Sequence, residues 1–199
     1  MRIIKFIFPL LILCVFSCKN NRTDLTKVNH DDFKTIHPNF TLSSSAIEHG
    51  VLLDAYKCEK KVNGEENSIP LSWQNVPEGT KSLAIVMYHY PKKDDKTEIN
   101  SYLLLWNISP KITEIPYKMA KSGTWYMGAN KDGNTISYTS PCSQGKGKHK
   151  YTVALYALSE TPSSLPKYHS LEVDYNIFMN AIGETKIIDR TTLTFIDTK

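Results

Sequence analysis

Strong net charge, internal repeats and long apolar runs are all lacking in this chain of 199 residues. The formal net charge is only +4 and is spread along the chain, so the composition does not indicate a nucleic-acid partner. No repeat and no low-complexity tract occurs, which excludes a solenoid or a fibrous protein. With 41% hydrophobic and 22% charged residues, the composition is ordinary for one globular domain that can bury a core without metal.

The common sequence signatures of catalysis and metal binding are also missing. The chain contains no G-x-x-x-x-G-K-[ST] phosphate loop, no G-x-S-x-G elbow and no H-E-x-x-H motif. Its six histidines show no close metal-ligand spacing, and no recognisable motif pairs two carboxylates for acid–base work. We therefore predict a binding protein and not an enzyme, with no cofactor and no metal.

The first residues are typical of a secretory signal. Arg2 and Lys5 precede the apolar run 6–16, which is shorter than the roughly 20 residues that span a bilayer. The sequence V-F-S-C, ending at Cys18, resembles a bacterial lipobox with a small residue directly before the cysteine. We predict a lipoprotein signal peptide at 1–17 and a lipid anchor on Cys18. An uncleaved membrane anchor or an ordinary secretory signal is the alternative.

The lipoprotein hypothesis places the protein in the bacterial cell envelope, anchored to a membrane with the domain in the periplasm or at the surface. Residues 18–39 are polar with little apolar periodicity, so we predict a tether there and a folded domain at 40–199. Once the signal peptide is removed and the anchor cysteine is acylated, Cys58 and Cys142 remain as an even pair in an oxidising compartment. The pair predicts a disulfide, and two free thiols are the alternative.

Most of the domain is predicted to be β-strand. Segments rich in β-branched, aromatic and aliphatic residues lie at 40–42, 82–90, 102–108, 151–158 and 191–196, and turn signals separate them at 63–64, 77–79, 91–95 and 132–134. The segments 83–87 and 103–106 are apolar on both faces, which predicts central strands that are covered on both sides.

One helix is predicted near the C-terminus. Asp174 can cap it, and five apolar residues fall on one stripe at helical spacing: Ile177, Phe178, Ala181, Ile182 and Ile188. The balance of elements predicts an all-β sandwich with one or two peripheral helices.

Four segments in a fixed order carry a family resemblance. They are NSIPLSWQNVPEGTKSLAIVMY (67–88), YLLLWNIS (102–109), YTSPCSQGKGKHKYTVALYAL (138–158) and AIGETKII (181–188). Together they resemble the phosphatidylethanolamine-binding protein family, in its bacterial Raf-kinase-inhibitor-like branch, over about residues 40–196. The family pattern S-P-x-L-x-W…P-x-G-T-x-S is similar to 68–73 and 77–82, and its G-P-C-P-P…H-R-Y stretch is similar to 140–144 and 149–151.

The resemblance implies a Greek-key β-sandwich with a small pocket that binds phosphate-like head groups. His149 and Tyr151 match the histidine and tyrosine that line this pocket in the family. Pro141 and Cys142 would form a lip of the pocket, and Trp73 would support its floor. From the residues alone, His149 could be a solvated histidine in a basic loop, Tyr151 a core-edge aromatic and Trp73 a core anchor.

The chain also departs from the family pattern at the expected pocket. Where the family has D-P-D-x-P, this chain has Y-H-Y-P at 88–91 and lacks both aspartates. Tyr102 stands where the family has a histidine, and residues 143–144 replace a proline pair. We expect His89 to replace a lost aspartate, or else to be solvated beside Pro91. Tyr102 is either part of the pocket lining or a core-edge aromatic.

The functional prediction is a lipid-anchored cell-envelope binding module for a small anionic or phospho-head-group ligand. One alternative is a protein-interaction or inhibitor module with a vestigial pocket, and a weaker one is a hydrolase that uses His149 as its base. If His149 and His89 both keep the usual histidine pKa of about 6.5, binding of an anion that keeps its charge should strengthen between roughly pH 8 and pH 5.5. Expected partners are the small anion and the membrane through the lipid anchor, with a protein partner under the interaction-module alternative, but not nucleic acid.

Overall fold

The computed structural model describes residues 35–58, 67–92, 95–96 and 98–199. The predicted signal peptide with Cys18, most of the predicted tether and the turn signal at 63–64 lie outside these residues. Among the described residues, no helix is both long and apolar enough to cross a membrane.

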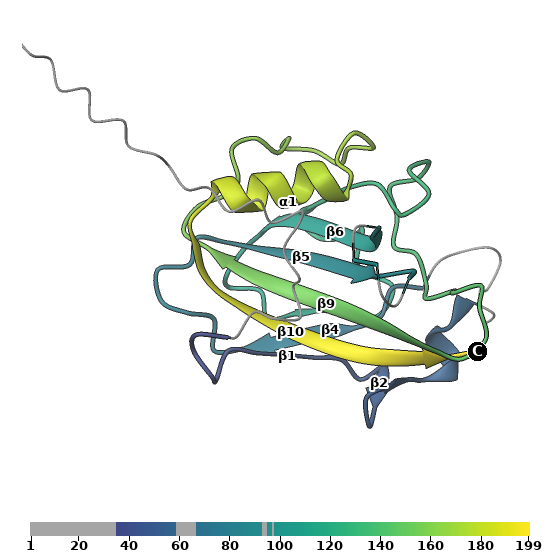
Figure 1. The fold of residues 1–199 in the computed structure, drawn as a ribbon. Helices are drawn as coiled ribbons and strands as arrows, with labels where there is room; N and C mark the ends of the chain where they lie inside the picture. The colour runs from purple at the N-terminus through teal and green to yellow at the C-terminus, as the bar shows by residue number, and fades with distance from the viewer. Residues whose placement is uncertain (1–34, 59–66, 93–94, 97) are drawn as a thin grey trace, which may run out of the picture.

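Within the described residues, two β-sheets and one α-helix form the domain (Figure 1). The large sheet has the strand order β2-β3-β10-β9-β5-β6-β8, and the small sheet has the order β1-β4-β7. The bounds are β1 (Thr41–Ser43), β2 (Ile47–Glu48), β3 (Val51–Leu52), η3 (Asp54–Tyr56), β4 (Leu71–Gln74), β5 (Ser82–His89), β6 (Asn100–Ile108), β7 (Glu114–Ile115), β8 (Tyr126–Met127), β9 (Lys148–Leu158), α1 (Tyr175–Glu184) and β10 (Ile187–Thr198). The predicted β-sandwich with a C-terminal helix is confirmed.

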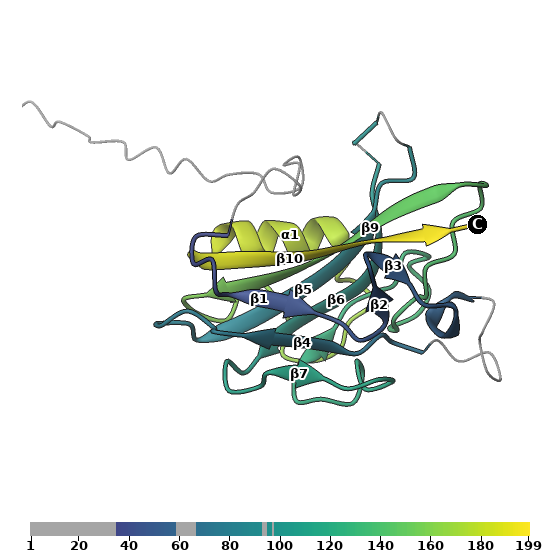
Figure 2. The same ribbon diagram turned by 90° about the horizontal axis from the view of Figure 1, so that it is seen from below.

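The central strands of the large sheet are covered on both faces, as the two-sided apolar segments predict. Every residue of β5 is buried, and Val86 in its middle pairs with Leu104 of β6 and Ala154 of β9. One face packs against the small sheet, with Trp73 and Phe40 in the shared core, and the other face packs under α1. Figure 2 shows the small sheet and α1 on opposite sides of the large sheet.

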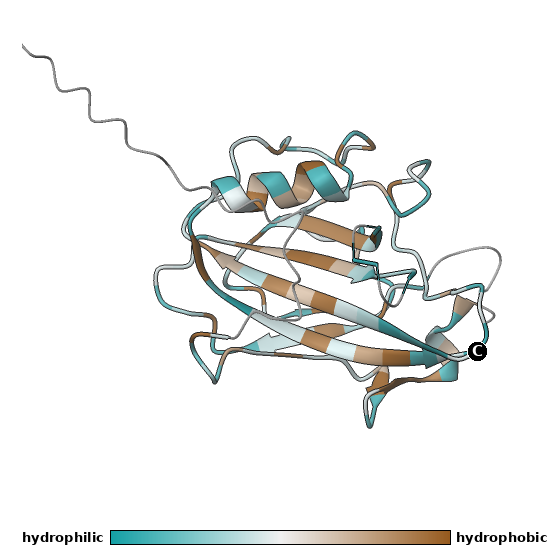
Figure 3. Cartoon of the chain, viewed as in Figure 1, coloured by the Kyte–Doolittle hydropathy of each residue, from teal (hydrophilic) through white to brown (hydrophobic). Residues whose placement is uncertain are grey.

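Hydropathy along the strands follows the same arrangement. In Figure 3 the apolar residues gather on the middle of the large sheet, whereas the strand ends near the C-terminus are hydrophilic. Within the single strand β9, the chain passes from an exposed Lys148 to eight consecutive buried residues, 151–158. Stability therefore comes from the middle of the sheet, and polar groups collect at one end of its strands.

The helix forms where predicted, but two of its expected stripe residues, Ile177 and Ile188, are not on its buried face. Asp174 caps the helix, because its side chain accepts a hydrogen bond from the Ile177 amide at 2.9 Å. Ile177 itself is 46% exposed, since its side chain lies outside the buried face. Ile188 lies in β10, because the helix ends at Glu184 and the β-branched run that follows continues as a strand. The buried face consists of Tyr175, Phe178, Met179, Ala181 and Ile182.

Candidate functional site

The candidate site lies where β5 and β9 reach the same end of the large sheet. The pairing of β5 with β9 stops at His89 and Tyr151, while β9 continues to Lys148 alongside β10. His149 is therefore a half-buried residue within a strand, and not the solvated loop residue of the alternative interpretation. Side chains alternate along a strand, so His149 and Tyr151 lie on the same face of β9.

Four of the six predicted pocket residues form one aromatic cluster at this end. The His89 ring stacks on Tyr151 with centroids 4.7 Å apart, and it meets the His149 ring edge to face at 5.7 Å. Tyr102 contacts Tyr151 edge to face at 5.2 Å. On the far side, Phe195 of β10 stacks on Tyr151 at 5.5 Å and joins the cluster to the core. Packing on both faces of the tyrosine fixes the position of the polar groups.

A short hydrogen-bond chain sets the tautomer of His89. Its Nδ1 lies 2.9 Å from the carbonyl oxygen of Lys150, which can only accept, so Nδ1 carries the proton. In the neutral ring Nε2 is then an acceptor, and the Ser143 hydroxyl lies 3.4 Å from it. Ser143 Oγ is also 2.7 Å from the Tyr151 hydroxyl. When Ser143 donates to His89, Tyr151 donates to Ser143.

Ser143 is a site residue that the sequence analysis did not identify. In the sequence it stands out only as part of the pair, residues 143–144, that replaces two prolines of the family pattern. A proline at this position could not supply the hydroxyl group that joins His89 and Tyr151. The only signal in the sequence was this departure itself, three positions after the Ser140 of the matched motif.

The cluster borders a cavity of about 280 Å³. Its described lining consists of His89, Pro91, Asn100, Tyr102, Lys131, Cys142, Ser143, Gln144, Gly145 and His149. This volume is just below the range of pockets for drug-sized ligands, so the cavity suits a small group such as a phosphate. His149 Nε2 donates to the carbonyl of Gly145 at 2.8 Å, which ties the histidine to the glycine-rich segment.

Three predicted site residues do not line this cavity: Tyr151, which lies in the aromatic cluster behind it, Trp73 and Pro141. Trp73 is fully buried in the sandwich core, where its indole nitrogen donates to the Ile112 carbonyl at 2.9 Å. Pro141 is also buried, and its carbonyl accepts a hydrogen bond from the Cys58 amide at 3.3 Å. Each position stabilises the walls of the site, but the lining of the described cavity begins one residue after Pro141, at Cys142.

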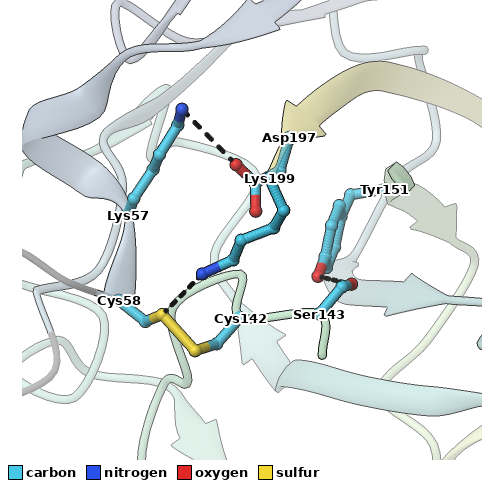
Figure 4. The surroundings of a disulfide bond; sticks show 7 residues. All are labelled: Lys57, Cys58, Cys142, Ser143, Tyr151, Asp197 and Lys199. Atoms are coloured by element: carbon cyan, nitrogen blue, oxygen red, sulfur yellow. Dashed lines mark hydrogen bonds and ion pairs between the residues drawn. A yellow bond between two sulfur atoms is a disulfide. The ribbon is translucent and has the colours of Figure 1, made fainter. Parts of the chain in front are cut away.

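The predicted disulfide between Cys58 and Cys142 is present, with the Cα atoms 5.4 Å apart (Figure 4). It links the segment after η3 to the loop before β9, and Ser143 follows directly in the chain. Lys199 Nζ donates to Cys58 Sγ at 3.5 Å. The bond therefore holds the wall of the cavity that presents the Ser143 hydroxyl.

A buried carboxylate, Asp197 of β10, lies behind this wall (Figure 4). It is 0% exposed and pairs with His149 in the strand register. Within the described residues neither of its oxygens accepts a hydrogen bond, and Lys57 Nζ forms an ion pair at 3.6 Å. Burial raises the pKa of Asp197, and the charges of Lys57 and His149 oppose this shift. Asp197 is thus a carboxylate near the site in a chain that lacks both family aspartates, and local sequence carried no signal for it.

The pKa of His89 differs from the ordinary value that we expected. Burial lowers it, and the hydrogen bond to the Lys150 carbonyl opposes that effect only in part. The positive charges of His149 and Lys96 lower the pKa further. His89 is therefore neutral at pH 7, and the expected rise in positive charge from pH 8 downward does not apply to this ring.

The two tyrosines remain protonated over the same pH range. Burial is the largest cause that raises the pKa of both Tyr102 and Tyr151, although a hydrogen bond with Ser143 works against it at Tyr151. At neutral pH Tyr102 thus presents a hydroxyl group at the cavity that can donate to an anion, whereas the buried Tyr151 hydroxyl is engaged with Ser143. Among the described residues, no group of three or more His, Cys, Asp or Glu side chains could hold a metal ion.

Comparison with known proteins identifies the family. The model of the phosphatidylethanolamine-binding protein family matches residues 43–193, which is most of the chain. The chain belongs to this family. The sequence is 28% identical over 144 residues to a UPF0098 protein of Methanothermobacter thermautotrophicus, covering 71% of this chain and 90% of that protein.

Solved structures have the same fold. A putative phosphatidylethanolamine-binding protein homologue from Chlamydia trachomatis, CT736, superimposes with a TM-score of 0.65 at 24% identity, over 80% of this chain and 97% of that one. YbcL of Escherichia coli, described as a member of the mammalian family, superimposes with a TM-score of 0.64 at 21% identity, over 81% and 99%. At these identities the likeness shows the fold alone.

Proposed function

We propose that this domain binds a small phosphate-like anion in the cavity beside Ser143 and that it performs no catalysis. The observation that carries the proposal is the convergence of donors on one cavity. His89, Tyr102 and Ser143 border it together with Lys131, whose ammonium group is paired with Asp132, and no carboxylate is found in its described lining. Membership of a family named for a phosphate-containing lipid supports the same ligand class.

Binding is coupled to a proton. In the free protein, neutral His89 accepts from Ser143 through Nε2. An anion in the cavity favours protonation of His89, because an adjacent negative charge stabilises imidazolium. Nε2 then becomes a donor, and the Ser143 hydroxyl is released to donate to the same anion. Two charge-assisted hydrogen bonds to the anion, one from His89 and one from Ser143, replace a single long contact.

The hydrolase alternative required His149 to act as a base. The Nε2 atom of His149 is engaged with the Gly145 carbonyl at 2.8 Å, and the nearby hydroxyl of Ser143 faces His89 instead. His89 has no carboxylate orienting its Nδ1, since that atom binds a backbone carbonyl. These contacts support binding without turnover.

Titration with inorganic phosphate at pH 6, followed by amide NMR shifts, tests the ligand. We expect the residues around Ser143 to shift and Ser143→Ala to weaken binding about tenfold, as the loss of a hydrogen bond to a charged group should. Ser164→Ala, at an exposed position away from the cavity, is the matched control. A protein that shows no shift near the cavity with phosphate would have a vestigial pocket, and the interaction-protein alternative would replace this proposal.

We further propose that Cys18 carries a lipid that anchors the domain in the cell envelope. The basic start, the short apolar run and the V-F-S-C sequence support this, and two or three acyl chains are enough for stable anchoring. Palmitate labelling of cells that express the full chain should mark the wild type and Cys14→Ala, but not Cys18→Ala. Label retained in Cys18→Ala, or none in the wild type, excludes the anchor.

A further inference from the structure

A second cavity lies at the same sheet end, in the notch where β5 stops and β9 continues. Beyond the pair of His89 and Tyr151, residues 148–150 of β9 are paired with β10 only. The chain after β5 folds over this edge, and a cavity of about 360 Å³ remains between them. Its described lining consists of His89, Tyr90, Pro91, Lys96, Lys148, His149, Lys150 and Thr152.

The described lining of the notch is entirely neutral or basic. Three lysines and two histidines border it, without any aspartate or glutamate. Lys96 Nζ lies 4.2 Å above the Tyr90 ring, which holds this ammonium group beside the cavity. The nearby acidic side chains Asp95 and Glu98 are engaged by Lys92, at 3.8 and 2.6 Å. The notch thus has a positive potential that favours an anion.

The notch and the cavity beside Ser143 share a wall. His89, Pro91 and His149 border both, and the centroids of the two imidazole rings are 5.7 Å apart. His149 is the more exposed of the two rings, so a ligand can cross the wall at its outer edge. One molecule could therefore place a charged group on each side of His149.

We propose that the notch is a second anion subsite and that the ligand class is a small molecule with two phosphate-like groups that straddle His149. This inference rests on the proposed function of the first cavity. Groups in van der Waals contact with opposite sides of a ring lie about 7 to 8 Å apart, twice the contact distance of 3.5 to 4.0 Å. A bisphosphate on a three-carbon chain has about this span, whereas the two phosphorus atoms of pyrophosphate are too close together.

Calorimetric titration compares three probes on the full domain: inorganic phosphate, pyrophosphate and propane-1,3-diyl bisphosphate. We expect the bisphosphate to bind with one molecule per protein and at least about tenfold more tightly than pyrophosphate, which carries similar charge but cannot reach both subsites. The double variant Lys96→Gln/Lys148→Gln should remove this advantage and leave phosphate affinity at the first cavity within about twofold. Lys111→Gln, an exposed lysine at the opposite end of β6, is the matched control and should change nothing.

The outcomes separate this inference from the proposed function. If phosphate binds near Ser143 but bisphosphate and pyrophosphate bind with equal affinity, the proposal of a second subsite is overturned. The proposed function of the first cavity then still holds. If the double variant Lys96→Gln/Lys148→Gln weakens the binding of all three probes equally, the second subsite is also overturned. The two lysines would then act only through the overall electrostatic potential of the protein. Failure of every probe to bind overturns both. In NMR, bisphosphate should shift the amides of Ser143 and Thr152 together, and a shift confined to Ser143 contradicts the straddling arrangement.

Discussion

Strand β10 carries two buried aspartates, one near each end, and their surroundings differ sharply. Asp189 is 1% exposed and accepts hydrogen bonds from three backbone amides, among them those of Ile36 and His37 at 2.8 Å. Asp197 is 0% exposed, yet within the described residues it accepts none, and its ion-pair partner Lys57 stays 3.6 Å away. One aspartate is thus fully hydrogen-bonded at its end of β10. The other, at the opposite end, has only a lysine partner at a longer distance.

The pKa shifts of the two carboxyl groups have opposite signs for this reason. Burial alone would raise the pKa of Asp189, but the amides of Ile36, His37 and Arg190 outweigh it, and the net shift is downward. At Asp197 burial prevails over Lys57, and the pKa is raised. The Asp189 end fastens the segment that enters the domain, whereas the Asp197 end adjoins the candidate site. Buried groups with incomplete hydrogen bonding are found preferentially at functional sites.

Removing the Cys58–Cys142 disulfide should have the largest effect on the free energy of unfolding, because this bond is a covalent cross-link close to Asp197. The two cysteines are 84 positions apart, and the chain-entropy model gives a loss of about 4.5 kcal/mol for opening such a loop. Urea unfolding of Cys58→Ala/Cys142→Ala measures it, with the reduced wild type as the control. A loss below about 1 kcal/mol would mean that hydrogen bonds and packing alone hold this end.

Asp189→Asn should lower the free energy of unfolding by about 2 kcal/mol at pH 7, since the amide side chain cannot satisfy several donors at once. The pKa of Asp189 is depressed in the folded state, so its contribution is present above the unfolded pKa of about 3.9 and is lost as pH falls through the folded value. The difference between wild type and variant should therefore shrink in acid. Glu160→Gln, an exposed charge removal, is the control for net charge.

Asp197→Asn should behave in the opposite way and stabilise the protein at pH 7 by up to about 1 kcal/mol, because no charge remains to be desolvated. Lys57 keeps its contact with Asp54 at 2.8 Å, so it is not left without a partner. The folded pKa of Asp197 is raised, so the wild type loses stability as pH rises through that value, and the gain should vanish near pH 3. A loss of stability comparable to that of Asp189→Asn would show that the two ends do not differ.

The smallest effect is expected in the pH dependence of phosphate binding. Because the pKa of free His89 lies below about 6.5, affinity should rise as pH falls below that value and not from pH 8. Uptake of one proton limits the slope to about tenfold per pH unit. His89→Gln, which keeps a polar side chain, should flatten the dependence below pH 6.5 when affinities are measured at constant ionic strength. An unchanged slope in this variant would assign the proton to another group.

Local sequence was sufficient for much of the fold. Two-sided apolar segments identified β5 and β6 as central strands, and Asp174 as a cap located α1. The ordered motifs identified the family, and cysteine parity identified the disulfide. These features depend on periodicity, capping and composition, which can be recognised from residues that are close together in the sequence. The stripe that wrongly included Ile188 fails for the same reason, since periodicity cannot tell where tertiary packing turns a helix into a strand.

By itself, then, the sequence determined the sandwich, the helix and the presence of His149, Tyr151, Tyr102 and His89 near one site. Only the tertiary structure decided what these residues contact. Ser143 meets His89 across 54 positions, and Asp197 comes beside His149 through the register of β9 and β10. Hydrogen-bond partners and burial set the tautomer and the direction of each pKa shift. Hydrogen-bond partners and burial depend on which strand, distant in the sequence, lies alongside in the folded domain. Local sequence patterns do not specify that strand.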